Sequence, residues 1–498
     1  MNPSAENPLP HPLSARRRAG LLLHPTSLPG EGESGDLGES AHRFVDVLAG
    51  CGMTVWQMLP LGPTHSDRSP YQCLSAHAGN PRLISRRRLE EWGWLGSGLS
   101  SAEHDWLGLA QAGFIRAAGE SGWQALEDFR REQAFWLEDY ALYQALRQEH
   151  DGAPWWQWPQ PLRDRDAEAL AQARERLGTR LARVHFEQFV FFRQWQDLRQ
   201  HAARQGILLF GDVPIFVAHD SADVWTCRRC FSLGEDGQPL TVAGVPPDFF
   251  SATGQRWGNP LFRWEVMQAD GFRWWIERMR TQLRMFDLLR IDHFRGFESY
   301  WEIPAQETTA VNGHWVAAPG EALFRALNDE FGALPLVVED LGAITDEVRA
   351  LRRKLSLPGM NVLQFAFDGS PDNSHLPHRH DANSVVYTGT HDNDTTLGWY
   401  DVLPADARTY VMDYLGMPGD PMPWALIRAA LASVSALAML PMQDVLGLGA
   451  SGRMNTPGTT TGNWQWRFSW DQFDDRTASR LRHLVRLYGR LAGGLQRP

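Results

Sequence analysis

Short apolar runs that end in polar, glycine or proline residues recur along the chain of 498 residues. Continuous apolar runs of this length are typical of strands buried on both faces, and the intervals between them are long enough for crossover helices. The runs are Ala19–His24, Thr54–Leu61, Gly206–Pro214, Leu288–Phe294, Leu336–Asp340, Asn361–Phe367, Ser384–Tyr387 and Ala436–Met442. Eight strands with helical crossovers predict an α/β fold of the (β/α)8 TIM barrel type.

One crossover helix is clear just before the third run. Phe191, Trp195, Leu198 and Ala202 recur at the spacing of one helical face, and Gly206 follows where a helix C-cap belongs. The pattern predicts a helix that packs on the barrel and ends at Gly206.

The interval between the second and third runs is about 140 residues long, far more than one crossover requires. Its composition is rich in Trp, Glu, Arg and Ala. We expect a mostly helical insertion over about residues 82–181, packed on the barrel. The domain organisation is then a polar N-terminal lead, 1–18, followed by a single catalytic domain, 19–498, which contains this insertion.

The charge balance is acidic, with 48 Lys plus Arg against 59 Asp plus Glu and a net charge of -11. Nucleic acid and anionic membranes are poor partners for such a surface. The N-terminal residues show no signal peptide or membrane span, so we expect a cytoplasmic protein, and no obligatory protein partner is inferred.

The four cysteines are too few and too scattered for a disulfide framework. Cys227 and Cys230 have the spacing of a redox pair or half a zinc site, but no second Cys/His pair follows at zinc-like distance. We interpret them as incidental, reduced thiols, and expect neither an organic cofactor nor an obligatory metal. A calcium ion bound through carboxylates and carbonyls would escape this reasoning.

Carboxylates close or follow three of the apolar runs. Asp292 ends the fourth, Glu339 ends the fifth and Asp392 follows the seventh, beside His391. The active site of such a barrel lies at the C-terminal ends of its strands, so these side chains are candidates for one catalytic group. A pair of carboxylates is what cleavage of a glycosidic bond requires.

The surroundings of each carboxylate suggest its role. Arg290 lies two residues before Asp292 on the same face of the strand, where its charge favours an ionised nucleophile. Burial in an apolar run raises the pKa of Glu339, which suits a proton donor. Asp392 can bind sugar hydroxyls or stabilise positive charge at the anomeric centre. The alternative is a buried ion pair of Arg290 and Asp292, with Glu339 capping the next helix.

Several longer motifs resemble a known family. They are His24-Pro25-Thr26-Ser27-Leu28-Pro29, Ser69-Pro70-Tyr71-Gln72, Gly211-Asp212-Val213-Pro214-Ile215, Gly244-Val245-Pro246-Pro247-Asp248-Phe249-Phe250-Ser251, Gly254-Gln255-Arg256-Trp257-Gly258-Asn259-Pro260 and Asn455-Thr456-Pro457-Gly458-Thr459. With the three carboxylate segments, they resemble the 4-alpha-glucanotransferases of the amylomaltase or disproportionating-enzyme type, glycoside hydrolase family 77. The resemblance extends from about Ala19 to Phe468.

The resemblance implies a retaining enzyme that moves alpha-1,4-glucan segments, with maltooligosaccharides and alpha-1,4-glucans as donor and acceptor. It implies Asp292 as nucleophile, Glu339 as acid/base and Asp392 as transition-state stabiliser. The predicted substrate contacts are Arg290, His391, Asp212, Tyr71, Phe249, Phe250, Trp257, Asp368 and Trp464. Val55 stands where members often carry Tyr, so the accessory glucan contact proposed at that position is not expected here.

A transferase must keep water away from its covalent intermediate, or place the acceptor hydroxyl far better for attack than a water molecule. The segment 244–260 is apolar and contains Gly254 and Gly258, so we interpret it as an active-site lid; a loop anchored by its aromatic residues is the alternative. The Trp-rich stretch 154–159 is interpreted as pinning the insertion to the barrel rather than as a glucan platform. The stretch 447–462 is either a flexible loop or part of the rim after the eighth strand.

Two other functions remain open at this stage. One is an alpha-amylase-like hydrolase, and the other is a catalytically silent glucan-binding barrel. The product pattern from maltotriose discriminates among the three.

Overall fold

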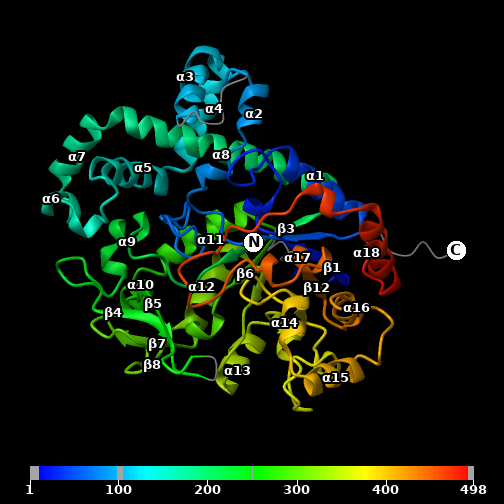
Figure 1. Cartoon of the computed structure of the whole chain (residues 1–498). Helices are drawn as coiled ribbons and strands as arrows, with labels where there is room; N and C mark the ends of the chain where they lie inside the picture. The colour runs from blue at the N-terminus through cyan, green and yellow to red at the C-terminus, as the bar shows by residue number, and fades with distance from the viewer. Residues whose placement is uncertain (1–10, 98–104, 249–250, 492–498) are drawn as a thin grey trace, which may run out of the picture.

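The computed structural model describes residues 11–97, 105–248 and 251–491 (Figure 1). Eight parallel strands pair in the order β10-β11-β12-β1-β2-β3-β6-β9. Between the two outer strands of this order, the Val338 amide donates to the Pro358 carbonyl at 2.9 Å, which closes the sheet into a barrel. The strands are β1 (Arg18–Leu22), β2 (Val55–Gln57), β3 (Leu208–Val213), β6 (Leu288–Ile291), β9 (Leu336–Val338), β10 (Gly359–Val362), β11 (Ser384–Tyr387) and β12 (Leu437–Pro441). The predicted TIM barrel is confirmed, and seven of the eight predicted runs cover their strands to within one residue. The sixth is displaced, because β10 begins at Gly359 and the chain turns into a 3-10 helix, Leu363–Phe365, where the run Asn361–Phe367 was expected to continue as a strand.

Alternate residues of the strands fill the barrel interior. Their buried cluster contains Leu13, Val55, Phe210, Leu288, Val337, Met360, Val362, Val385, Tyr387, Leu437 and Met439. The intervening residues, such as Leu289 and Val338, belong to the larger cluster under the helices. Because side chains alternate between faces, Arg290 follows Leu288 on the interior face and Glu339 follows Val337. The charged residues therefore lie at the C-terminal end of the barrel interior, where their strands end.

Helices surround this barrel. Those outside the insertion are α1 (Glu39–Gly50), α9 (Ala222–Thr226), α10 (Trp264–Ala269), α11 (Arg273–Met285), α12 (Gly320–Phe331), α13 (Asp346–Lys354), α14 (Thr396–Val402), α15 (Ala405–Tyr414), α16 (Trp424–Ala432), α17 (Met442–Val445) and α18 (Asp475–Leu487). None of the helices in the described residues is long and apolar enough to span a membrane.

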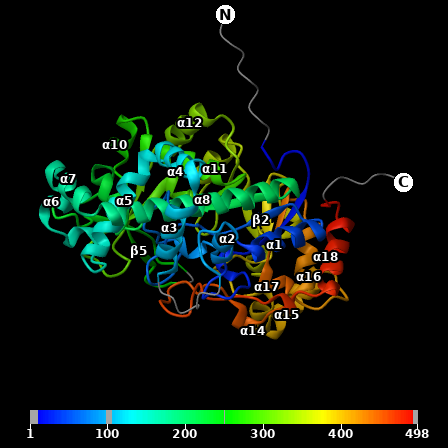
Figure 2. The same cartoon turned by 90° about the horizontal axis from the view of Figure 1, so that it is seen from above.

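The interval between β2 and β3 is helical. It holds α2 (Arg86–Glu91), α3 (Trp106–Ala117), α4 (Gly119–Glu132), α5 (Ala134–Glu149), α6 (Gln160–Arg163), α7 (Ala167–Arg176) and α8 (Gly178–Arg204). Figure 2 shows α8 running from the outer helices of the insertion to the barrel. α8 continues without interruption across residue 181, near which the insertion was expected to end. Its barrel end carries the predicted packing stripe, and Gly206 follows it with a φ of 71°.

The tryptophans of the stretch 154–159 pin the insertion, as interpreted from the sequence. Trp155 is fully buried and donates through Nε1 to the His219 carbonyl at 2.8 Å. Trp158 is buried beside Trp225 of α9, with ring centroids 5.4 Å apart.

A second, antiparallel sheet stands beside the barrel in the order β5-β4-β7-β8 (Figure 1). Its strands are β4 (Thr241–Val245), β5 (Gln255–Pro260), β7 (Ser299–Pro304) and β8 (His314–Ala317). The segment 244–260 is therefore not simply a loop, since β4 and β5 pair with each other. Its glycines and prolines obscured the strands, and the partner strand β7 comes only after β6 in the chain.

The end of the predicted polar lead packs against the barrel. Leu13 is buried in the interior cluster, and Arg17 donates to the Leu431 and Tyr488 carbonyls. The described part of the lead thus covers the N-terminal end of the barrel.

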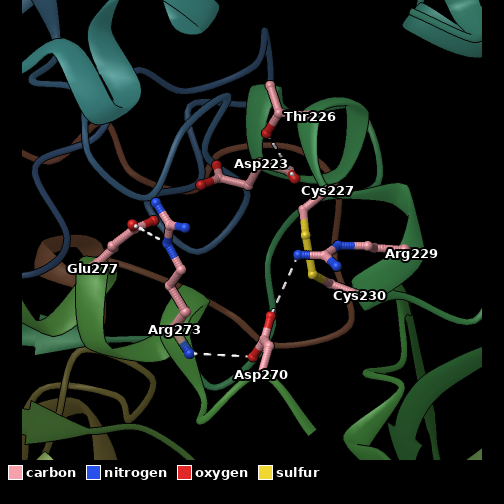
Figure 3. The surroundings of a disulfide bond; sticks show 8 residues. All are labelled: Asp223, Thr226, Cys227, Arg229, Cys230, Asp270, Arg273 and Glu277. Atoms are coloured by element: carbon pink, nitrogen blue, oxygen red, sulfur yellow. Dashed lines mark hydrogen bonds and ion pairs between the residues drawn. A yellow bond between two sulfur atoms is a disulfide. The ribbon is translucent and has the colours of Figure 1, made fainter. Parts of the chain in front are cut away.

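The cysteine interpretation is wrong: Cys227 and Cys230 form a disulfide (Figure 3). A short 3-10 turn, Arg228–Cys230, brings their Cα atoms to 5.4 Å, within the range that a disulfide bridges. The spacing of two residues does not by itself reveal such a turn. Cys51 and Cys73 are free.

Candidate active site

Three neighbouring strands bring the predicted acidic and basic residues together. The register pairs Asp212 of β3 with Arg290 of β6, and Ile291 of β6 with Val338 of β9. Asp292 and Glu339 each follow one member of the latter pair, so they lie side by side at the C-terminal rim. The grouping results from parallel register, which places residues far apart in sequence at equal height.

Arg290 links two carboxylates. Its Nη1 donates to both Asp212 oxygens at 2.9 and 2.7 Å, and its Nη2 donates to Asp292 Oδ1 at 2.8 Å. Burial lowers the pKa of Arg290, but Asp212 and Asp292 together raise it well above its ordinary value. The guanidinium therefore stays cationic and holds Asp292 in one orientation. The side chain of Asp212 is fully buried, whereas that of Asp292 is 25% exposed and open to a substrate.

Tyr71 completes this arrangement from the loop after β2. Its hydroxyl donates to Asp212 Oδ2 at 2.6 Å, and burial, followed by the charge of Asp212, raises its pKa well above the ordinary value. The phenol thus remains a neutral donor. Its ring stacks on His391 at 5.1 Å, which connects the β3 side of the rim to the loop after β11.

Glu339 is held by two backbone amides. His293 N donates to Oε2 at 2.7 Å and Leu341 N donates to Oε1 at 3.0 Å. Burial, aided by the neighbouring charge of Asp292, raises the pKa of Glu339 to about 7 against the opposing effect of Arg290. The predicted raised pKa is confirmed. The helix-capping alternative is wrong, because the residue at the N-cap of α13 is Thr345.

Asp392 is held by residues that follow the eighth strand. Asn455 Nδ2 donates to Asp392 Oδ1 at 2.6 Å, and Arg453 Nη2 donates to the Asp392 backbone carbonyl at 2.7 Å. His391 Nε2 lies 3.4 Å from the same Oδ1. The loop 447–462 is therefore part of the rim, at least through Arg453 and Asn455. Sequence reasoning included Asn455 in a motif but assigned a role to neither residue.

Two tryptophans border the carboxylates. The Trp257 ring on β5 packs edge-on against His293, the residue after Asp292, with centroids 4.9 Å apart. Trp464 is nearly buried, 6.0 Å from both the Tyr71 and His391 rings. A small open hollow, lined in part by His391, Asp394 and Arg453, adjoins this group.

One predicted contact is not joined to this group, and two others cannot be placed. Asp368 is exposed, and its carboxylate accepts from the Ser370 amide in its own turn. Phe249 and Phe250 lie outside the described residues. Among the residues that the structure does describe, no group of three or more His, Cys, Asp or Glu side chains is placed to hold a metal ion.

Removing the charge of Arg290 should destabilise the fold. We expect Arg290→Met to lower the free energy of unfolding by about 3–5 kcal/mol, because Asp212 would remain buried without its partner. Urea unfolding followed by tryptophan fluorescence measures the loss. Adding Asp212→Asn should recover part of the stability, since it removes the uncompensated charge; no recovery would contradict the assignment of the loss to Asp212.

Comparisons with known proteins agree with this architecture. A family profile described as 4-alpha-glucanotransferase, glycoside hydrolase family 77, matches residues 23–472. The chain is 49% identical over 496 residues to a 4-alpha-glucanotransferase of Thermus thermophilus, covering 95% of this chain and 99% of that protein. It is 43% identical over 501 residues to the chloroplastic/amyloplastic 4-alpha-glucanotransferase of Solanum tuberosum, covering 96% and 87%.

Solved structures give the same result. The amylomaltase of Streptococcus agalactiae, in complex with acarbose, superposes with a TM-score of 0.92 at 35% identity, covering 96% of this chain and all of that one. The amylomaltase of Corynebacterium glutamicum shares the fold, with a TM-score of 0.71 at 18% identity over 95% of this chain and 75% of that one. The chain belongs to the 4-alpha-glucanotransferases of glycoside hydrolase family 77.

Proposed function

We propose that this chain is a retaining 4-alpha-glucanotransferase in which Asp292 is the nucleophile, Glu339 the acid/base and Asp392 the stabiliser of the transition state. The enzyme cleaves an alpha-1,4 bond of a maltooligosaccharide or longer glucan. It then transfers the donor segment to the 4-hydroxyl of glucose or another maltooligosaccharide.

In the first half-reaction, the protonated Glu339 carboxyl gives its proton to the glycosidic oxygen. Asp292 forms a bond to C1 of the donor sugar as the C1–O bond breaks, and the shortened glucan leaves with the proton. The attacking atom is Asp292 Oδ2, since Oδ1 accepts the hydrogen bond from Arg290. Asp392, oriented by Asn455, faces the positive charge that develops at C1.

In the second half-reaction, Glu339 is a carboxylate and takes the proton of the acceptor's 4-hydroxyl. The acceptor oxygen bonds to C1, and the ester bond to Asp292 breaks. Two inversions at C1 restore the alpha configuration. The two amides on Glu339 suit both stages, because backbone N–H groups stabilise the carboxylate while burial favours the acid.

The choice between acceptor and water depends on what covers the intermediate. Trp257 lies against His293, beside Asp292, and offers an apolar face to pyranose C–H groups. We assign the β4–β5 hairpin the role of the predicted lid. Arg290, His391, Asp212, Tyr71 and Trp464 are proposed to contact or position the donor sugar, and Asp368 remains a prediction.

The observation that carries this proposal is the pairing of two unlike carboxylates on adjacent strands. One is fixed by a permanent cation and open to substrate; the other is buried, with a pKa of about 7. Such a divergence between neighbours is what an acid and a nucleophile require near neutral pH. A catalytically silent barrel has no need of it.

The pH dependence should report Glu339. Because its pKa is raised to about 7, the carboxyl is protonated below that pH and loses its proton above it. We expect kcat/KM for maltotriose to fall about tenfold per pH unit on the alkaline side. For an α-glucosyl fluoride, whose fluoride leaves without protonation, kcat/KM should not show this alkaline decrease. A flat profile for maltotriose between about pH 7 and about pH 9 would contradict the assignment.

Incubation with maltotriose tests the function. Transfer predicts free glucose and a ladder of longer maltooligosaccharides at a nearly constant number of reducing ends. A rise in reducing ends without longer products would instead indicate an alpha-amylase-like hydrolase. An unchanged substrate would favour a glucan-binding barrel.

A further inference from the structure

A polar cleft of about 810 Å³ outside the catalytic group is lined in part by Cys227 of the Cys227–Cys230 disulfide. Its walls come from α5 of the insertion and from α9 and α11 beside the barrel. Cys227 lines the cleft and is partly exposed, whereas Cys230 is fully buried. An external thiolate can therefore approach the bond from the Cys227 side.

Two arginines adjoin the bond in a cleft whose other charged side chains are mostly acidic, with Asp139, Asp223, Asp270 and Glu277 against Arg229 and Arg273. Both residues between the cysteines are arginines, and Arg229 lines the cleft with 68% of its side chain exposed (Figure 3). Its guanidinium lies 3.5 Å from Asp270 in a weak, exposed pair. A nearby cation stabilises a thiolate, both the attacking one and the one released.

The disulfide-bonded turn is attached to the strand that carries Trp257. The Cys230 carbonyl accepts from Arg263 N at 2.8 Å, and Ser232 N donates to the Leu261 carbonyl at 2.8 Å. Leu261 directly follows the end of β5 at Pro260. The turn thus anchors the C-terminal end of β5.

From β5 the contacts continue to the catalytic carboxylate. Trp257 of β5 packs on His293, and the His293 amide donates to Glu339. Phe262, two positions after the end of β5, packs at a tilt against Phe231, which directly follows the turn, with ring centroids 5.4 Å apart. Opening the disulfide would therefore make the turn less rigid, and with it the position of Trp257, which we assign to cover the site.

We infer that Cys227–Cys230 is a reversible disulfide, opened from the cleft by a dithiol reductant, and that opening it increases the share of the covalent intermediate lost to water. The inference rests on the proposed function for its kinetic readout.

The exchange balances in two steps. A thiolate of the reductant bonds to Cys227 Sγ, the Cys227–Cys230 bond breaks, and Cys230 leaves as a thiolate that takes up a proton. The second thiol of the reductant then attacks the reductant sulfur that is bonded to Cys227. The reductant closes into a disulfide, and Cys227 leaves as a thiolate that takes up a proton. The protein disulfide gains two electrons and two protons, and the dithiol is oxidised to a disulfide.

The test compares the oxidised and reduced full-length enzyme. The folded protein is treated with graded dithiothreitol, the reductant is removed without air, and free thiols are alkylated and located by peptide mass. Product ladders and reducing ends from maltotriose then give the hydrolysis-to-transfer ratio. We expect Cys227 and Cys230 to become alkylated while the protein stays folded, and the ratio to rise roughly threefold.

Variants separate this bond from the other thiols. Cys227→Ser combined with Cys230→Ser should show the reduced enzyme's ratio with or without reductant, and Cys51→Ser should respond as the wild type does. A bond that resists reduction in the folded enzyme, or reduction without a change in ratio, would overturn the inference. The inference would also be overturned if reductant changed the hydrolysis-to-transfer ratio of the double variant as much as that of the wild type. Absence of any ladder in both redox states would refute the proposed function, while peptide mass would still decide whether the bond is reducible.

Discussion

Replacing Asp292 by Asn should reduce transfer by at least about 10⁴-fold, since the covalent intermediate can no longer form. The amide keeps an oxygen that accepts the hydrogen bond from Arg290 Nη2, so the geometry of the site is preserved. The rate of product formation from maltotriose measures the loss. Intact mass after incubation with a slow α-glucosyl fluoride should show a glucosyl adduct in the wild type and none in the variant.

The matched control is Asp346→Asn, at the start of α13, where the side chain is 91% exposed. It should leave both activity and thermal unfolding near wild-type values. Asp292→Asn should unfold at nearly the wild-type temperature, because its side chain is partly exposed and Arg290 keeps Asp212. Substantial turnover by a preparation free of deamidated enzyme would remove Asp292 from the nucleophile role.

Replacing Glu339 by Gln should lower kcat/KM for maltotriose by about 10²- to 10⁴-fold, the usual contribution of general acid catalysis. Glutamine has no proton to give to the glycosidic oxygen. With α-glucosyl fluoride, the first half-reaction needs no acid, so formation of the glucosyl adduct should stay within about tenfold of the wild type.

The same variant has a structural cost that must be measured. Both Glu339 oxygens accept backbone N–H groups, so one end of the glutamine amide would face a donor. We expect a destabilisation of about 1–3 kcal/mol, visible in thermal unfolding. A comparable loss of rate with maltotriose and with α-glucosyl fluoride would indicate distortion of the site rather than loss of the acid.

Much of the catalytic geometry could be predicted because it depends on local alternation along a strand. Leu288 and Arg290 share a face of β6, Asp292 comes directly after the strand, and Glu339 follows an apolar run that must be buried. The face of the strand on which a residue lies, and its burial within an apolar run, both depend on a few consecutive residues. They were sufficient to predict the position of Arg290 beside Asp292 and the raised pKa of Glu339.

Partners supplied by distant strands could not be predicted in the same way. Asp212 was expected only as a substrate contact, yet it shares Arg290 with Asp292 through the β3–β6 register. Asn455 reaches Asp392 from a loop 63 residues later in the chain. The lengths and paths of the intervening loops decide such contacts, and no local pattern encodes them.

The barrel, its strands and the carboxylates at their ends follow from local pattern, because buried strands require apolar runs and the barrel places its active site where those runs end. Three features depend on the folded chain instead: α8 continues from the insertion to the barrel, segment 244–260 contains strand residues that pair, and Cys227 meets Cys230. Each of these depends on which surfaces come together in three dimensions, and the free energy of that packing outweighs the weak preferences of the residues concerned.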